Sequence, residues 1–207
     1  MKILFQGDSI TDCDRIRTDP TDMGKGYARF VKARLSLDYP AKYEFVNRGV
    51  GGNRIADVYA RMYPDITSIK PDLMSIMIGT NDYPWNEHEK YQVRFERIFN
   101  MLLDDVKSDL PDIKFMILEP FVLPGDRVVA ENYPLRREHT ERRSEAAQRV
   151  AERFGAKFVP MQKALDAVLD QAPIEYWTIE GVHLTEAGHQ ILADEWIKAF
   201  KQMYDLQ

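Results

Sequence analysis

A nearly unbroken apolar run at residues 72–78 sets the class of fold that this chain can adopt. A strand of this kind is buried on both faces, which is the usual position of a central strand in a parallel sheet. Shorter apolar runs predict four more strands, at residues 3–5, 44–46, 113–118 and 157–159. Because helical patterns separate these runs, we expect a three-layer α/β/α fold with a five-stranded parallel sheet.

Apolar residues recur at helical spacing between the predicted strands. The predicted helices cover residues 27–39, 55–63, 87–107, 135–154 and 161–169, and a last helix begins after Thr185 as its N-cap. We expect Pro64 to end or kink the second helix. Residues 120–134 show no pattern, and because long irregular loops are often functional, we interpret them as a flap on the substrate side.

The bulk composition limits the kind of protein and its partners. With 207 residues, 44% of them hydrophobic, we expect residues 1–207 to form one domain. The formal charge of -5 and the lack of a basic block argue against nucleic acid as a partner. No apolar run approaches the roughly 20 residues of a membrane-spanning helix, so we expect no membrane partner. The N-terminus shows no secretion signal and Cys13 is the only cysteine, which together predict a cytoplasmic protein.

Polar residues that are candidates for catalysis follow the predicted strands. Ser9 follows the first strand, a glycine-rich loop follows the second, and Asn81 follows the third. The loop before the last helix carries Glu180 and His183. Because parallel strands bring their carboxyl ends to one edge, these residues can converge. Acyl transfer requires a nucleophile, a base, a group that orients the base and donors for the oxyanion, and the chain has a candidate for each. The glycine-rich loop fits two interpretations equally well: a loop that holds an anion with its backbone N–H groups, and a tight turn from strand to helix.

Among the four histidines, only His183 lies on a predicted loop with an acidic neighbour. We expect His88 and His139 to lie exposed on charged helices, and His189 lies inside the last helix. No pair of histidines or cysteines has the spacing of metal ligands. The sequence therefore implies neither a metal nor a cofactor.

Four sequence blocks, at residues 7–10, 47–53, 79–82 and 181–184, resemble in order the four blocks of the SGNH, or GDSL-type, esterases and lipases. The resemblance implies a flavodoxin-like strand order. It also implies that Ser9 is the nucleophile, that His183 is the base, and that the backbone N–H groups of Ser9 and Gly52 form an oxyanion hole with the Asn81 amide. Within the family, the chain looks most like the small intracellular acetylxylan esterases, which remove acetyl groups from xylo-oligosaccharides.

The chain departs from the family pattern at one position. The family usually has Asp three residues before the histidine, and this chain has Glu180. Glu can orient an imidazole, and we expect it to complete the triad, provided that the loop sits back far enough for the extra methylene. The alternative is that Glu180 points away and that a backbone carbonyl or water orients His183.

Several residues near these blocks are candidates for binding the substrate. The aromatic side chains of Tyr83, Trp85, Tyr176 and Trp177 could stack on a sugar ring, and we also assign Asp8 to this group. The resulting prediction is a serine esterase that acts on short acyl esters, with an acetylated carbohydrate as its small-molecule substrate. A lysophospholipase or thioesterase of the same family and a non-catalytic carbohydrate-binding protein are the alternatives. The resemblance also makes a homo-oligomer an expectation.

Overall fold

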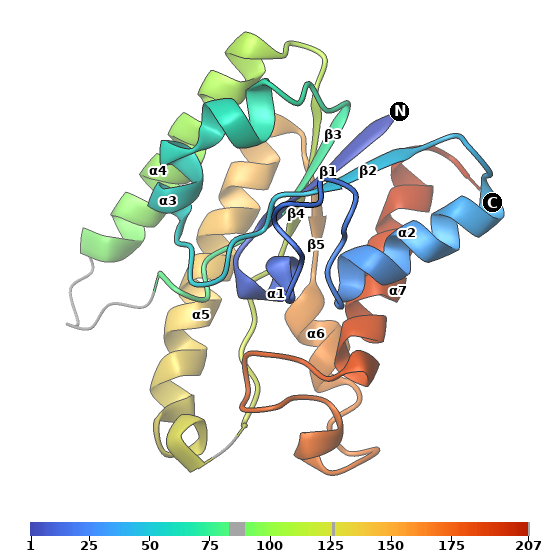
Figure 1. Cartoon of the computed structure of the whole chain (residues 1–207). Helices are drawn as coiled ribbons and strands as arrows, with labels where there is room; N and C mark the ends of the chain where they lie inside the picture. The colour runs from blue at the N-terminus through green and yellow to red at the C-terminus, as the bar shows by residue number, and fades with distance from the viewer. Residues whose placement is uncertain (83–89, 126, 207) are drawn as a thin grey trace.

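The computed structural model describes residues 1–82, 90–125 and 127–206. Its centre is a parallel sheet with the strand order β2-β1-β3-β4-β5 (Figure 1). The strands are β1 (Lys2–Gly7), β2 (Glu44–Asn47), β3 (Leu73–Met77), β4 (Lys114–Leu118) and β5 (Lys157–Val159). The predicted five-stranded parallel sheet and its flavodoxin-like order are therefore confirmed.

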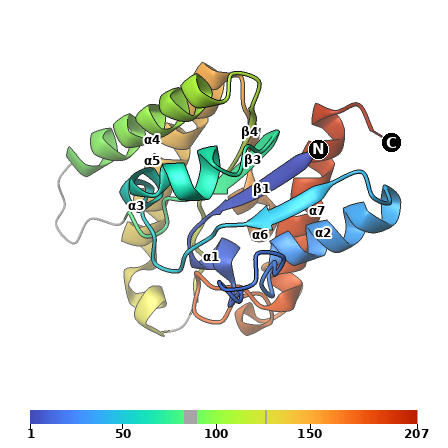
Figure 2. The ribbon, with the colours of Figure 1, turned by 45° about the horizontal axis from the view of Figure 1, so that its top comes forward.

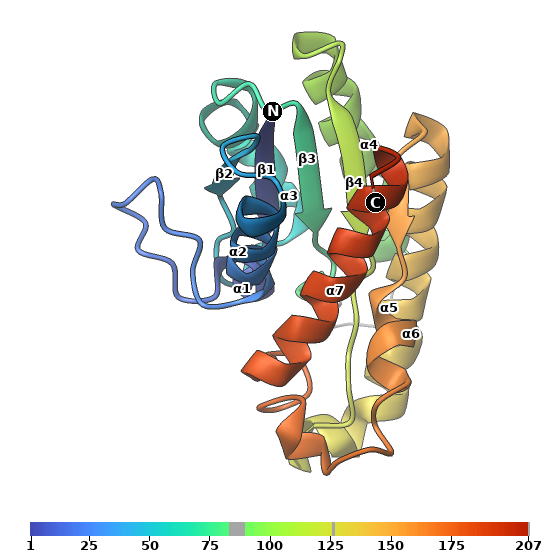
Figure 3. The same ribbon diagram turned by 90° about the vertical axis from the view of Figure 1, so that its right-hand side faces the viewer.

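Helices cover both faces of the sheet. One face carries α3 (Ile55–Ala60), α4 (Lys90–Asp109) and α5 (Arg127–Phe154), and the other carries α2 (Tyr27–Asp38), α6 (Met161–Asp166) and α7 (Glu186–Met203) (Figures 1 and 3). Short helical segments complete the chain: α1 (Ser9–Asp12), a π-helix at Tyr63–Thr67 and a 3-10 helix at Ile174–Tyr176. None of the helices in the described part of the chain has both the length and the apolar character needed to cross a bilayer.

Side chains on the two faces of the sheet belong to two separate clusters of buried residues. In β1, Ile3 and Phe5 pack toward α2 and α7, whereas Leu4 packs toward α3 and α4. This alternation follows from the two-residue period of a strand. Ser75, the polar residue inside the apolar run, accepts a hydrogen bond of 2.8 Å from the indole N–H of the buried Trp196. The buried Ser75 hydroxyl thereby has a hydrogen-bond partner, so its burial costs little free energy.

The prediction of an irregular stretch at residues 120–134 holds up to residue 125 and is wrong from Arg127 onward. Residues 121–123 are buried, and α5 begins at Arg127 and contains Pro134. Proline removes one helical hydrogen bond, but the first half of α5 is held by tertiary contacts. Arg137 makes two hydrogen bonds with the carboxylate of Asp166 in α6, at 2.9 and 3.1 Å. Residues 121–123 are therefore packed in the interior and do not form a surface flap, whereas Asn132 and Pro134 on α5 are exposed.

Two smaller expectations also fail. Pro64 does not end a helix, because it lies in the first turn of the π-helix, where its missing N–H costs little. His139 is buried, with 7% of its surface exposed. It lies four residues before Arg143 and eight before Ala147, both of which are buried, so it shares the inner face of α5. The many charged residues in the sequence of α5 gave no sign of this buried face. His88 lies outside the described residues.

Candidate active site

Ser9 lies at the carboxyl end of β1, in the first turn of α1 (Figure 2). Residues 9–12 form one helical turn. Asp8 caps this turn, because its Oδ1 accepts a hydrogen bond of 3.0 Å from the Ile10 N–H. Gly7 precedes it at a point where any Cβ would collide with the Met77 carbonyl oxygen. Local sequence therefore turns the chain sharply at the edge of the sheet and places Ser9 there.

The loop that carries His183 is organised by Thr178. The Thr178 hydroxyl donates to the His183 carbonyl oxygen at 2.7 Å and accepts from the Gly181 N–H at 2.8 Å. Thr178 also pairs with Leu184 in an antiparallel bridge. Directly after this loop, Thr185 caps α7, as predicted. The backbone around His183 is therefore fixed by hydrogen bonds within seven residues of chain.

The side chains of Ser9, His183 and Glu180 are joined by hydrogen bonds. His183 Nε2 lies 2.8 Å from Ser9 Oγ, and His183 Nδ1 lies 2.5 Å from Glu180 Oε1. The same Glu180 oxygen accepts the backbone N–H of His183 at 3.0 Å. Glu180 thus faces the imidazole and does not point away. An ionised carboxylate at Nδ1 requires the proton on that nitrogen, which leaves Nε2 as the acceptor for the serine hydroxyl.

The loops after β2 and β3 are connected beside Ser9. The Asn81 side-chain amide donates to the Asn53 carbonyl oxygen at 3.1 Å, which leaves its second N–H for another acceptor. The Ile55 N–H donates to the carboxylate of Asp82. Gly52 has a φ of +79° and faces open space. The glycine-rich segment is therefore a left-handed turn whose neighbour in space is the Asn81 loop.

Two carboxylates lie at this edge of the sheet, Asp8 buried and Asp82 half-buried. Burial raises the pKa of Asp8 to about 7, and the nearby charge of Asp82 acts in the same direction, against the hydrogen bond from Ile10. Burial likewise raises the pKa of Asp82 to about 6. Asp8 was expected to contact the substrate, but only 1% of its surface is exposed. Its place is inside the protein as the cap of α1, because the strand-to-helix turn folds it inward.

The aromatic candidates do not form the expected sugar platform in the described residues. Tyr83 and Trp85 lie outside them. Tyr176 and Trp177 pack edge to face against each other, with ring centroids 4.8 Å apart, and Tyr176 is 58% exposed. Neither residue lines the cleft that contains Ser9 and His183. These two rings belong to the outer side of the loop before α7.

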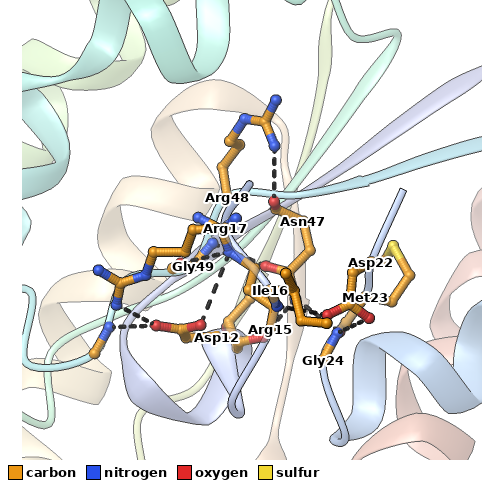
Figure 4. A network of polar contacts seen from close by, with 12 residues as sticks. Asp12, Arg15, Ile16, Arg17, Asp22, Met23, Gly24, Asn47, Arg48 and Gly49 are labelled. Carbon is orange, nitrogen blue, oxygen red and sulfur yellow. Dashed lines mark hydrogen bonds and ion pairs between the residues drawn. The ribbon is translucent and has the colours of Figure 1, made fainter. Parts of the chain in front are cut away.

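The cleft at Ser9 and His183 has a volume of about 630 Å³ and extends toward the loop after α1. Its walls include charged side chains and one exposed apolar side chain that sequence reasoning missed, namely Asp14, Arg15, Arg17 and Ile179. Figure 4 shows Arg15 and Arg17 beside Asp12. The available signal for Asp14, Arg15 and Arg17 was their position, because residues that immediately follow the turn at Ser9 are close to it whatever their type.

Cys13 and His189 also line the cleft, but their contacts are structural. His189 Nδ1 accepts the Tyr27 N–H at 3.2 Å, and its Nε2 lies 3.4 Å from Cys13 Sγ. Burial lowers the pKa of His189 to about 4, so its ring is neutral near pH 7. Among the described residues, no group of three or more His, Cys, Asp or Glu side chains could hold a metal ion.

A parallel α/β/α sheet that carries a hydrogen-bonded serine, histidine and carboxylate at its carboxyl edge is the architecture of a serine hydrolase. Residues 5–191 match the profile of the GDSL-like lipase/acylhydrolase family. The chain belongs to this family and is a carboxylic ester hydrolase.

Its relatives include characterised and solved proteins. The chain is 34% identical to an acetylxylan esterase of Geobacillus stearothermophilus, over 95% of this chain and 92% of that protein. A crystal structure of an acetylxylan esterase from the same organism matches with a TM-score of 0.83 and 30% identity, covering 96% of this chain and 93% of the other. A candidate GDSL-like lipase from Parabacteroides merdae matches with a TM-score of 0.86 and 32% identity, covering 96% and 94%.

Proposed function

We propose that this esterase removes acetyl groups from short xylo-oligosaccharides, with Ser9 as its nucleophile. The observation that carries the proposal is the line of hydrogen bonds from Ser9 Oγ through His183 to Glu180. Ser9 Oγ attacks the carbonyl carbon of the ester while His183 Nε2 accepts its proton. Glu180 keeps the imidazole oriented and stabilises its positive charge.

The second half of the reaction uses the same groups in reverse. Protonated His183 gives its proton to the leaving sugar oxygen, and the acetyl group remains on Ser9. His183 then accepts a proton from water as the water attacks the acyl carbon, and it returns this proton to Ser9 Oγ as the bond between that oxygen and the acyl carbon breaks and acetate leaves. The backbone N–H groups of Ser9 and Gly52 and the free N–H of the Asn81 amide stabilise the oxyanion. Support for these roles comes from the second N–H of Asn81, which has no hydrogen-bond partner among residues 1–82, 90–125 and 127–206, and from the open position of Gly52.

Two observations support an acetylated carbohydrate as the substrate: the similarity to an acetylxylan esterase and the charged walls of the cleft. The Geobacillus stearothermophilus protein to which the chain is 34% identical is an acetylxylan esterase. Charged side chains of Asp14 and Arg17 line the cleft. Such walls suit a hydroxylated substrate and disfavour a long alkyl chain, because charges lose solvation against hydrocarbon. We therefore favour deacetylation over a lysophospholipase or thioesterase activity.

Labelling with an organophosphonate tests the nucleophile. An activated serine reacts with this reagent, so mass spectrometry of the treated protein should show one adduct on the peptide that contains Ser9. The Ser9→Ala variant is the control, and it should lose both the label and the hydrolysis of p-nitrophenyl acetate. Full activity of Ser9→Ala would exclude the mechanism, and an unlabelled, inactive wild type would favour a non-catalytic carbohydrate-binding protein.

Two substrate series test the specificity. With p-nitrophenyl esters of increasing acyl length, we expect kcat/KM to be highest for acetate and to fall steeply for longer chains. With acetylated xylo-oligosaccharides and lysophospholipids, acetate release from the sugars should dominate. A preference for long acyl chains would instead favour the lysophospholipase or thioesterase alternative.

A further inference from the structure

The carboxylate of Asp12 connects the helix that carries Ser9 to the glycine-rich loop. Asp12 is the last residue of α1, and its side chain is 9% exposed. Its Oδ2 accepts the backbone N–H of Gly51 at 2.9 Å and a hydrogen bond from Arg17 Nη2 at 2.7 Å. A carboxylate held by a charged donor is a strong hydrogen-bond acceptor, so the contact with Gly51 is stable.

The remainder of the loop is fixed by a polar network around Asp12 (Figure 4). Arg15 donates from Nε to the Gly49 carbonyl oxygen at 2.9 Å. The side-chain amide of Asn47 donates from Nδ2 to the backbone carbonyl oxygens of Thr11 and Met23. Its side-chain oxygen Oδ1 accepts the Gly49 N–H. A Cβ at Gly49 would collide with the backbone of residues 11 and 12. Polar contacts therefore hold the loop tightly against α1 up to Gly51.

Gly51 is the last residue of this loop that the network holds, and it lies beside the nucleophile. A Cβ placed on Gly51 would lie 3.8 Å from the Cβ of Ser9. The next residue is Gly52, with its left-handed φ of +79°. Adjacent glycines have wide conformational freedom, which here is limited by the Asn53 N–H, because it donates to the Val50 carbonyl oxygen at 3.1 Å and closes a turn around them. The anchor at Gly51 adds a further restriction on where the N–H of Gly52 can point.

We propose that Asp12 is a positioning residue that fixes the Gly52 N–H as an oxyanion donor by holding the Gly51 N–H. The proposal rests on the oxyanion hole of the proposed function. It differs from a substrate-binding role, which the place of Asp12 in the wall of the cleft would also allow. A positioning role affects kcat, whereas a binding role affects KM.

The test compares the Asp12→Ala variant with wild type on p-nitrophenyl acetate and on its thionoester. Sulfur is a weak hydrogen-bond acceptor, so the thionoester depends little on the oxyanion hole. Loss of one oxyanion donor lowers kcat by 10²–10³, and a misplaced donor should cost about 10- to 100-fold on the oxygen ester. We expect KM and the thionoester rate to change by less than about threefold, so that the ratio of oxygen-ester to thionoester rates falls.

Asp12→Asn provides the rescue variant. Both short hydrogen bonds of Asp12 end on the same oxygen, so an asparagine carbonyl oxygen can accept both. We expect Asp12→Asn to retain most of the wild-type ratio of rates. If Asp12→Ala does not fold by circular dichroism, Asp12→Glu, which keeps the charge but moves the oxygen, should show the lowered ratio.

Asp57→Ala is the matched control, because Asp57 also accepts a backbone N–H near this loop, that of Arg54 at 2.8 Å, and lines no part of the cleft. It should leave the ratio unchanged. An equal loss on both esters, or a raised KM at unchanged kcat, would overturn the positioning role. If Ser9→Ala is inactive and Asp12→Ala keeps the wild-type ratio, only this inference fails. If Ser9→Ala is fully active, the proposed function fails as well.

Discussion

At the scale of single residues, Glu180 is the position where this chain differs from the usual pattern of its family. Its side chain folds back so that one oxygen accepts both the ring N–H and the backbone N–H of His183. The backbone of Glu180 packs closely against Gly125. A glutamate at this position therefore reaches Nδ1 of the imidazole.

We predict that Glu180→Gln lowers kcat on p-nitrophenyl acetate by roughly 10⁴, by analogy with the acid member of other serine hydrolase triads. The amide cannot stabilise the imidazolium, and it can hold the ring in the wrong tautomer. KM should change little, because Glu180 does not line the cleft. A loss below tenfold would show that another group orients His183. Glu175→Gln, a substitution in the 3-10 helix of the same segment, is the control and should retain activity.

At the scale of elements, the site depends on how the loop before α7 packs on the segment after β4. The Leu123 N–H donates to the Gly181 carbonyl oxygen at 2.7 Å. Gly125 lies so close to the backbone of Glu180 and Gly181 that any Cβ there would overlap it. Residues 121–125, expected to be part of a flap, are thus the platform for the histidine loop.

We predict that Gly125→Ala lowers kcat by about 10- to 100-fold, because a displacement of about 1 Å in a catalytic group can cost 10²-fold. The steady-state rate on p-nitrophenyl acetate measures the effect. Gly155→Ala is the control, since Gly155 faces open space at the end of α5 with a φ of +59°. Strain there should cost about 1–2 kcal/mol of stability and leave kcat unchanged. Equal kcat values for the two variants would contradict the platform role.

At the scale of the whole molecule, the carboxyl edge of the sheet holds a buried acid, Asp8, and a half-buried one, Asp82, whose titration is linked to folding. Asp8 has its pKa raised by burial to about 7 and Asp82 to about 6, from an ordinary value of 3.8. The folded protein therefore holds these protons more tightly than the unfolded chain. This contribution to stability is fully present below pH 3.8 and is lost as the pH rises through about 7.

We predict that Asp8→Asn reduces the dependence of the free energy of unfolding on pH between about 4 and 7. Asparagine keeps a carbonyl oxygen for the Ile10 N–H and removes the titrating group. Urea unfolding at several pH values measures the slope. Asp170→Asn, at an exposed position, should retain the wild-type slope. A wild-type slope in Asp8→Asn would mean that Asp8 does not hold a proton in the folded protein.

The sequence by itself determined the five parallel strands and the place of each candidate group along the chain, whereas the strand order was only implied by the family resemblance. Apolar runs such as residues 72–78 and the polar residues that follow them are local signals, and a parallel topology brings the ends of such strands to one edge. Ser9, Asn81 and His183 could therefore be assigned to one site without coordinates. Their catalytic roles are predictions, which the experiments described above test.

Only the tertiary structure decided which side chains face the cleft and which are enclosed. Asp8 and His139 are buried, α5 continues through Pro134, and Glu180 turns toward His183. Asp12 reaches Gly51 across 39 residues of chain. Each of these results depends on contacts between segments that are distant in sequence. Residue type and periodicity describe a side chain's own neighbourhood, whereas burial and hydrogen-bond partners depend on what folds against it.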